Sequence, residues 1–339
     1  MTPKERFGAF LTGKPMDRFL CVPLILNHAA RVQGVTVGEY NRNGRLMGES
    51  HAAAWRRYGH DLIAIFSDTA MLAEAMGTVQ QYVPDDVPRV DRPAVTDPND
   101  LSRLILDASG DAEPLPVFYE AVRVAIQATG GDVPVSCCVP APFTTAACLR
   151  GTDQFARDLY RNPALAHRLL QAATQVGMRF ADGIIDSGGI PVVVDPVATG
   201  SVVGPRQFDA FALPYLKQLH AHMAARGVPV VLHICGQTHR ILDEILKADA
   251  NLLSLDDIPM SEARDRAGDK VGLMGNVRPA QTLLKGTPET VAREVEELCA
   301  VGRGCRCGFI LGSGCEVPLE SPPANIDAMM AAAREYGRL

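Results

Sequence analysis

Short runs of apolar residues recur along the chain and alternate with longer stretches of helical spacing. Eight runs are rich in β-branched or aliphatic residues and bounded by Gly, Pro or charged residues, which is typical of strands buried on both faces. They cover residues 18–26, 61–68, 133–140, 190–197, 228–235, 251–257, 270–277 and 306–314. Helical spacing is clearest at 205–227, 238–250 and 288–302. The alternation of strand and helix predicts parallel pairing.

Eight such units predict an α/β protein, a (β/α)8 barrel formed by residues 1–339 as a single domain with an N-terminal extension. The extra length lies mostly at residues 84–116, which are rich in Pro and Asp and predict a long loop between the second and third strands, with one helical turn inside it. A surface excursion is the simpler interpretation of this loop, and a lid or docking loop is the alternative. An open doubly wound sheet is the competing fold, but no G-x-G-x-x-G follows an early strand.

Composition narrows the class of protein. With 47% hydrophobic and 21% charged residues the chain resembles an ordinary soluble enzyme, and its net charge of −6 argues against nucleic acid as the main partner. No apolar run approaches the roughly 18 residues of a membrane helix, and MTPKERFGAF at the N-terminus has no apolar core of a signal peptide. We therefore expect a cytoplasmic protein that binds no membrane. Its nine cysteines are expected to be reduced thiols or metal ligands.

Polar residues end several of the predicted strands. In a (β/α)8 barrel such residues meet at one mouth, where the active site lies. The residues concerned are Asp68, Asp195, His233, Cys235, Asp256, Asp257, Asn276 and Cys315. Each one alone has an ordinary explanation, because a carboxylate after a strand often caps the next helix and a lone buried His or Cys is usually packed in the core.

His233, Cys235 and Cys315 form a more specific set. His233 and Cys235 are two residues apart on one strand, so both side chains face the same side, and Cys315 ends another strand. Two thiolates and an imidazole suit a zinc ion with one open coordination position. Cys307 begins the last predicted strand, so it and Cys305 are expected at the end of the barrel opposite Cys315. We expect Cys137, Cys138 and Cys148 to lie in the core or a pocket wall, and Cys21 and Cys299 in the core.

The ligand types also constrain the chemistry. Hydrolytic zinc sites tend to use neutral His, which leaves the ion positive enough to acidify water. Two thiolates reduce that positive charge, so a thiol that joins the metal loses its proton while its sulfur stays nucleophilic. The set therefore favours activation of a thiol for alkyl transfer over activation of water.

Four segments resemble the uroporphyrinogen decarboxylase superfamily, and within it most closely the corrinoid-dependent methyltransferases that methylate coenzyme M. They are HICG at 233–236, DPVATGSVVGPRQF at 195–208, MGNVRPAQTLLKGTPETV at 274–291 and ILGSGCEVPLESPPANIDAM at 310–329. The most specific part is H-x-C followed about 80 residues later by GSGCEVP. The resemblance implies a (β/α)8 barrel and a zinc ion held by His233, Cys235 and Cys315.

Departures from the decarboxylase branch are equally informative. The decarboxylase branch has an Arg-rich segment near the N-terminus, and this chain has PLILNHAARVQG at 23–34 in its place, without the arginine cluster. Cys148 replaces an expected tyrosine, and Ser313 replaces the histidine of a G-H-G block. Asp68 of the F-S-D block is present. A polyanionic porphyrinogen needs cationic and hydrogen-bonding groups, so decarboxylation of uroporphyrinogen is disfavoured.

The predicted function is a zinc-dependent transfer of a methyl group between a corrinoid and a thiol or similar acceptor. The chain has no D-x-H-x-x-G segment, so a separate corrinoid protein is the expected partner. Asp256, Asp257 or another carboxylate would take the fourth zinc position at rest, while Asp195, Asn276 and Asp68 would orient the acceptor. One alternative is a donor-side enzyme that transfers the methyl group of a methoxylated or methylated substrate to the corrinoid. Another is a metal-free binding protein whose barrel has lost catalytic activity. A homodimer is left open.

Overall fold

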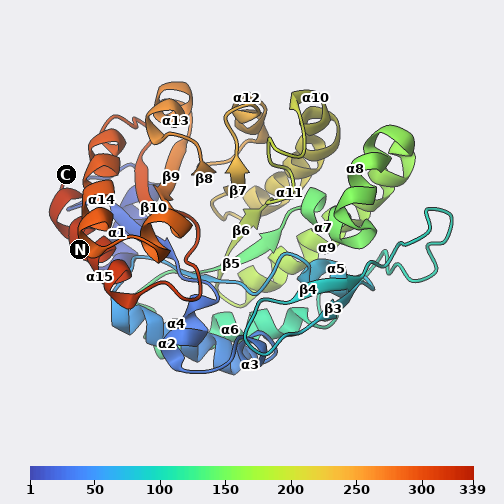
Figure 1. The fold of residues 1–339 in the computed structure, drawn as a ribbon, viewed down its shortest axis with the longest axis horizontal. Helices are drawn as coiled ribbons and strands as arrows, with labels where there is room; N and C mark the ends of the chain where they lie inside the picture. The colour runs from blue at the N-terminus through green and yellow to red at the C-terminus, as the bar shows by residue number, and fades with distance from the viewer.

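Eight parallel strands form one sheet that curves into a barrel in the computed structural model, which describes residues 1–339 (Figure 1). The strands are β1 (Leu20–Leu24), β2 (Ile63–Ile65), β5 (Val135–Pro140), β6 (Ile190–Val194), β7 (Val231–Gln237), β8 (Leu252–Asp257), β9 (Gly272–Val277) and β10 (Phe309–Glu316). Their order is β1-β10-β9-β8-β7-β6-β5-β2. Each lies within or overlaps one predicted segment, and the predicted (β/α)8 barrel is confirmed.

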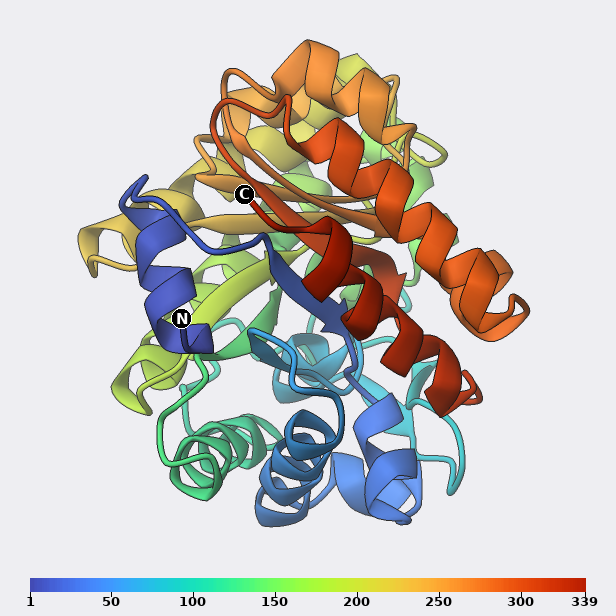
Figure 2. The same ribbon diagram turned by 90° about the vertical axis from the view of Figure 1, so that its left-hand side faces the viewer.

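Helices surround the barrel on its outside. They are α2 (His28–Gln33), α3 (Val37–Asn41), α4 (Gly44–Tyr58), α5 (Met71–Ala75), α6 (Leu115–Ala128), α7 (Pro142–Arg150), α8 (Thr152–Arg161), α9 (Pro163–Asp186), α10 (Pro205–Gln207), η1 (Phe208–Ala212), α11 (Leu213–Ala225), α12 (Leu242–Ile245), η2 (Leu246–Ala248), α13 (Met260–Ala267), η3 (Pro279–Leu284), α14 (Pro288–Gly302) and α15 (Pro323–Tyr336). Figure 2 shows α14 and α15 packed side by side. None of the helices has the combination of length and apolar character needed to cross a membrane.

Two of the three helical segments expected from the sequence differ in detail. The segment 288–302 is one helix, α14, as predicted. The segment 205–227 is interrupted by the π-helical turn η1, which ends just before Pro214, a residue that cannot donate a backbone hydrogen bond. The segment 238–250 shortens to α12 and η2, which end where Asp249 takes a left-handed conformation.

Strand alternation separates an outer core from the barrel interior. In β2, Ile63 and Ile65 are fully buried in the core beneath the helices, whereas Ala64 faces a cavity on the barrel axis. A second apolar cluster lies inside the barrel and comprises Leu20, Val22, Val231, Leu252, Met274 and Ile310. The interior of the barrel is therefore almost wholly apolar below its mouth.

The N-terminal extension includes helix α1 (Pro3–Leu11), which begins with a capping box between Thr2 and Glu5. Phe7 from this helix lines the axial cavity together with residues at the starts of the strands, so α1 covers the amino-terminal end of the barrel. Arg6 donates to the fully buried Asp61 at 2.6 Å, and Asp61 also pairs with Arg18. This ion cluster ties the extension to the segment before β2.

The long connection between the second and third barrel strands contains more structure than expected. Strands β3 (Val79–Gln81) and β4 (Arg89–Arg92) pair antiparallel beside α5, and irregular chain continues to α6 (Figure 1). The predicted loop at 84–116 therefore contains one strand of a hairpin. The sequence signal was weak because β4 reads RVDR, is mostly exposed and has Val90 as its one apolar residue.

Candidate metal centre

His233, Cys235 and Cys315 meet at the mouth of the barrel, on β7 and β10. Their possible ligand atoms all lie within 4.8 Å of one another. Nε2 of His233 is 3.0 Å from Sγ of Cys235, which is 3.3 Å from Sγ of Cys315. The structure thus brings together the three side chains that the sequence singled out from segments about 80 residues apart.

Strand β7 directs two of these side chains into the barrel and then changes course. His233 and Cys235 both line the axial cavity, as the alternation of a strand requires. Gly236 follows with a φ of 65°, and the pairing of β7 with β8 shifts register between Ile234 and Gln237. A side chain at position 236 would be strained in this left-handed conformation. The glycine amide donates to the Asp256 carboxylate at 2.9 Å.

Cys315 reaches the same place through an irregularity in β10. Val22 of β1 pairs with Gly312, but Leu24 pairs with Glu316, so β10 carries two extra residues at this point. The Ser313 hydroxyl accepts a hydrogen bond from the Leu24 amide at 2.9 Å and fills the gap in the ladder. Strict alternation from Ile310 would turn Cys315 outward, whereas the bulge turns it into the cavity.

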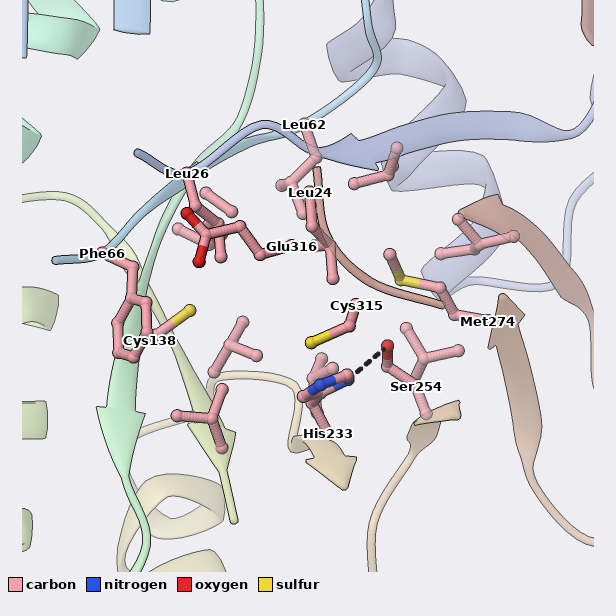
Figure 3. A pocket seen from close by; sticks show the side chains of 18 of the residues that line it. Leu24, Leu26, Leu62, Phe66, Cys138, His233, Ser254, Met274, Cys315 and Glu316 are labelled. Carbon is pink, nitrogen blue, oxygen red and sulfur yellow. Dashed lines mark hydrogen bonds between the residues drawn. The ribbon is translucent and has the colours of Figure 1, made fainter. Parts of the chain in front are cut away.

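His233 is held in one orientation by the next strand. Its Nδ1 lies 2.9 Å from the Ser254 hydroxyl (Figure 3), which leaves Nε2 facing the two sulfur atoms. A histidine that binds a metal usually donates its other ring N–H to a fixed partner, which sets the tautomer. The Ser254 contact provides that partner. The sequence signal for this residue was a hydroxyl at an inward position among the leucines of β8.

The Sγ atoms of Cys235 and Cys315 lie within hydrogen-bonding distance of one another. The hydrogen bond from Cys235 lowers the pKa of Cys315, with His233 acting in the same direction, and the same interaction with Cys315 raises the pKa of Cys235. A pair of sulfur atoms and an imidazole nitrogen this close together form the soft donor set that Zn²⁺ binds, with the cation replacing the proton of their hydrogen bond. The residues present therefore fit a zinc ion.

The ligands open onto an axial cavity of about 180 Å³. Glu316, which directly follows Cys315, also lines it, and Figure 3 shows its carboxylate near Leu26 and Phe66. Its Oε1 accepts hydrogen bonds from the Asn27 amide and side chain at 2.9 and 3.0 Å. Burial raises the pKa of Glu316 to about 7. Glu316 was not among the site residues predicted from the sequence; its one signal was a carboxylate directly after Cys315, at the carboxyl end of β10.

The predicted fourth-ligand candidates differ in position. Asp256 is partly buried beside the ligands, and burial is the main cause that raises its pKa, with the Cys315 thiolate acting in the same direction. It lies outside the set of atoms close enough to share a metal ion. Asp257 is exposed on the far side of the strand. Neither residue is placed as a fourth ligand by this geometry, so that role remains a prediction.

The residues predicted to orient the acceptor lie behind the cavity wall. Asp195 is fully buried, and its carboxylate accepts from the Thr144 amide and hydroxyl at the start of α7. Burial raises its pKa to about 7. Asn276 donates to the carbonyls of Asp256 and Ile258. Both side chains hold neighbouring segments together. Neither residue lines the cavity, so their contact with an acceptor stays a prediction.

Asp68 is likewise turned toward the backbone. It accepts from the Ser67 hydroxyl at 2.6 Å and from the Ala70 amide at 2.7 Å, next to the start of α5. Burial raises its pKa to about 6. Its neighbour Thr69, and not Asp68 itself, lines the cavity.

The other cysteines lie largely where the sequence suggested. Cys138 lines the cavity, and Cys137, Cys148, Cys21 and Cys299 are buried. Cys305 is buried and Cys307 exposed, both before the start of β10 and thus away from the mouth.

Fold and site together define a (β/α)8-barrel protein with a thiolate-rich candidate metal centre at the carboxyl end of its strands. The family model described as uroporphyrinogen decarboxylase (URO-D) matches residues 2–336, and the chain belongs to this family. The chain is 26% identical to the methylcobamide:CoM methyltransferase MtbA of Methanosarcina acetivorans, with 99% of this chain and 98% of that protein covered. It is 28% identical to the uroporphyrinogen decarboxylase of Bordetella petrii, over 83% of this chain and 80% of that protein.

A second methyltransferase and one solved structure complete the comparison. The methylated-thiol–coenzyme M methyltransferase of Methanosarcina mazei is 26% identical and covers 99% of this chain and 90% of its own length. A solved methyltransferase from Methanosarcina mazei superposes with a TM-score of 0.90 at 24% identity, covering 99% of both chains. The fold is therefore shared over the full length, and the similarity to these relatives supports an enzyme.

Proposed function

We propose that this protein is a zinc-dependent methyltransferase that moves a methyl group between a corrinoid, carried on a separate protein, and a small molecule. The single observation that carries the proposal is the convergence of His233, Cys235 and Cys315 on one cavity. The names of its methyltransferase relatives, which match almost the whole chain, support corrinoid-linked methyl transfer.

A bound zinc ion would supply an open coordination position that lowers the pKa of a substrate thiol or polarises a methylated heteroatom. The residues of this chain hold and orient that site. Ser254 fixes the His233 ring, and the hydrogen bond from Gly236 to Asp256 fixes the end of β7. The apolar walls of the cavity exclude water from the reacting atoms.

Methyl transfer in either direction balances without an oxidant. Toward the small molecule, a thiol and methyl-Co(III) give a methyl thioether, Co(I) and a proton. In the donor direction, a methylated compound, Co(I) and a proton give the demethylated compound and methyl-Co(III). Both directions need the same metal and the same open mouth, so both stay within the proposal, with the thiol acceptor as the first candidate.

Uroporphyrinogen decarboxylation is a weaker candidate for this cavity. A substrate with several carboxylates needs cationic partners, and no Lys or Arg lines the cavity. Ser313, which stands where the decarboxylase branch has a histidine, is engaged by the Leu24 amide. A metal-free binding protein is also disfavoured, because all three metal-binding side chains are present and converge.

Metal analysis coupled to a corrinoid assay tests the proposal. Wild type is expected to contain stoichiometric zinc and to convert methylcobalamin to cob(I)alamin, followed by absorbance, when a suitable thiol is added. Cys315→Ala should lose both properties. Cys307→Ala is the matched control, because this exposed cysteine lies at the other end of β10, and it should retain both. Wild type without zinc, and inactive with all thiols and methylated donors tried, would refute the proposal.

A further inference from the structure

We infer that the small molecule is uncharged and apolar, about the size of one aromatic ring, with its sulfur or oxygen atom at the metal end of the axial cavity. The inference rests on the proposed function and specifies its substrate class. It also sets this chain apart from relatives whose names specify coenzyme M, a thiol that carries a sulfonate group.

The first observation is the composition of the cavity wall. Of its 23 lining residues, 17 are hydrophobic, a count that includes Cys138 and the two metal-binding cysteines, and none is Lys or Arg. The wall runs from Phe7 at the closed end to His233, Cys235 and Cys315 at the mouth. An apolar ligand would lose little by leaving water for such a wall and would gain from burial.

The second observation concerns the polar atoms that remain. The Ser136 hydroxyl donates to the Ile63 carbonyl, and the Ser254 hydroxyl is engaged by His233. Glu316 is the one carboxylic acid of the wall, and its Oε1 accepts from Asn27. Thr69 contributes the one further hydroxyl of the wall. Away from the metal ligands, a buried sulfonate or carboxylate would meet no Lys or Arg side chain, and burial of an unpaired anion is strongly unfavourable.

The third observation is the size of the space. Barrel interiors are usually filled by layers of bulky side chains. Here small residues face the axis at Ala64, Ser136 and Ser254, and a cavity of about 180 Å³ results. An engineered apolar cavity of about 150 Å³ is known to hold benzene, so this one has room for about one substituted ring.

Two thiols that differ in charge and apolar area test the inference. The full-length protein, loaded with Co²⁺ in place of zinc, is titrated with benzyl mercaptan and with 2-mercaptoethanesulfonate, and the thiolate-to-cobalt absorption is followed. Benzyl mercaptan should bind with a dissociation constant lower by about tenfold or more. Equal or tighter binding of 2-mercaptoethanesulfonate would overturn the inference.

A pair of variants at one wall position tests the location. Ala64→Leu fills part of the cavity, whereas Ala64→Ser leaves its volume almost unchanged. With metal content intact, Ala64→Leu should raise the dissociation constant of benzyl mercaptan by about tenfold or more, and Ala64→Ser should raise it by far less. Unchanged binding to Ala64→Leu would contradict a ligand on the barrel axis. If Ala64→Leu does not fold, the comparison of the two thiols on wild type still decides.

Failure of the proposed function can be told apart from failure of this inference. Toluene has no metal-binding atom, so its binding to the zinc-free protein, measured by calorimetry, reports on the cavity alone and should be lost in Ala64→Leu. Toluene binding without any methyl transfer from methylcobalamin would leave the cavity assignment standing and refute the function. Methyl transfer to 2-mercaptoethanesulfonate in preference to benzyl mercaptan would support the proposed function and refute the inferred substrate class.

Discussion

The Ser254 hydroxyl lies 2.9 Å from Nδ1 of His233, and the two residues are direct register partners on neighbouring strands. The contact determines which ring nitrogen faces Cys235 and Cys315. A serine among the leucines of β8 thus orients one side chain of the candidate metal centre.

Ser254→Ala should weaken zinc binding by about 10- to 100-fold, because the imidazole loses the partner that fixes its tautomer and orientation. Competition with a chelator measures this change. Ser136→Ala is the matched control, since Ser136 also presents a hydroxyl to the cavity but bonds only to the Ile63 carbonyl. Equal affinities for wild type and Ser254→Ala would show that the contact does not orient the ligand.

Gly314→Ala should reduce both zinc content and stability. A Cβ at this position would lie 2.7 Å from Oδ1 of Asp256, so either that side chain or β10 must move, and Cys315 moves with the strand. We expect a cost of about 1–3 kcal/mol from the overpacking. Gly8→Ala serves as the control, because nothing lies within 4 Å of the added methyl group in helix α1. Elemental analysis and urea unfolding measure the two effects; a Gly314→Ala protein with full zinc and wild-type stability would contradict the close approach.

Asp61→Asn should destabilise the fold by about 3–5 kcal/mol, because Arg6 and Arg18 would be left beside a neutral side chain at a buried position. Glu49→Gln removes the exposed partner of Arg45 and should cost less than about 0.5 kcal/mol. Urea unfolding at neutral pH compares the two. Similar small losses in both variants would mean that the cluster contributes nothing beyond a surface ion pair.

His51 should make stability fall in mild acid. Burial lowers its pKa to about 3, and its Nε2 lies 2.7 Å from the Tyr40 hydroxyl. In the unfolded chain the pKa of this histidine is about 6.5. Below that pH the imidazole is therefore protonated in the unfolded state but stays neutral in the native state. The stabilising contribution is complete above pH 6.5 and is lost at about 1.4 kcal/mol per pH unit as the pH falls toward 3.

His51→Gln should therefore lose less stability in acid than wild type does. The difference in unfolding free energy between wild type and variant should shrink by about 2 kcal/mol between pH 6.5 and pH 5. His239→Gln, at a partly exposed position, is the matched control and should keep the wild-type dependence. Parallel curves for wild type and His51→Gln would contradict the prediction.

The barrel could be predicted because each strand is buried on both faces and reads as an apolar run. The convergence of His233 with Cys315 then follows from parallel pairing, which places all strand exits at one mouth. Strand β4 could not be found in this way, because it is mostly exposed and charged, and Val90 is its one apolar side chain packed against the core.

The details of the site depend on backbone geometry that the residue pattern does not encode. A bulge of two residues turns both Cys315 and Glu316 inward, where alternation allows only one of them. Asp195 and Asp256 both end strands, yet one caps α7 and the other stands beside the ligands. The cavity arises from the summed volumes of side chains on all eight strands, and no single segment reveals it.

The barrel closes between β1 and β2 with little strand pairing. The Asp61 amide donates to the Cys21 carbonyl, and the Asp61 side chain accepts from the Cys21 amide at 2.7 Å; the two strands share no register partners. A carboxylate thus replaces a ladder at this edge. In amide hydrogen exchange, we expect β1 and β2 to open in a subglobal step while β7 to β10 stay protected. The barrel would then open first on the side opposite the candidate metal ligands of β7.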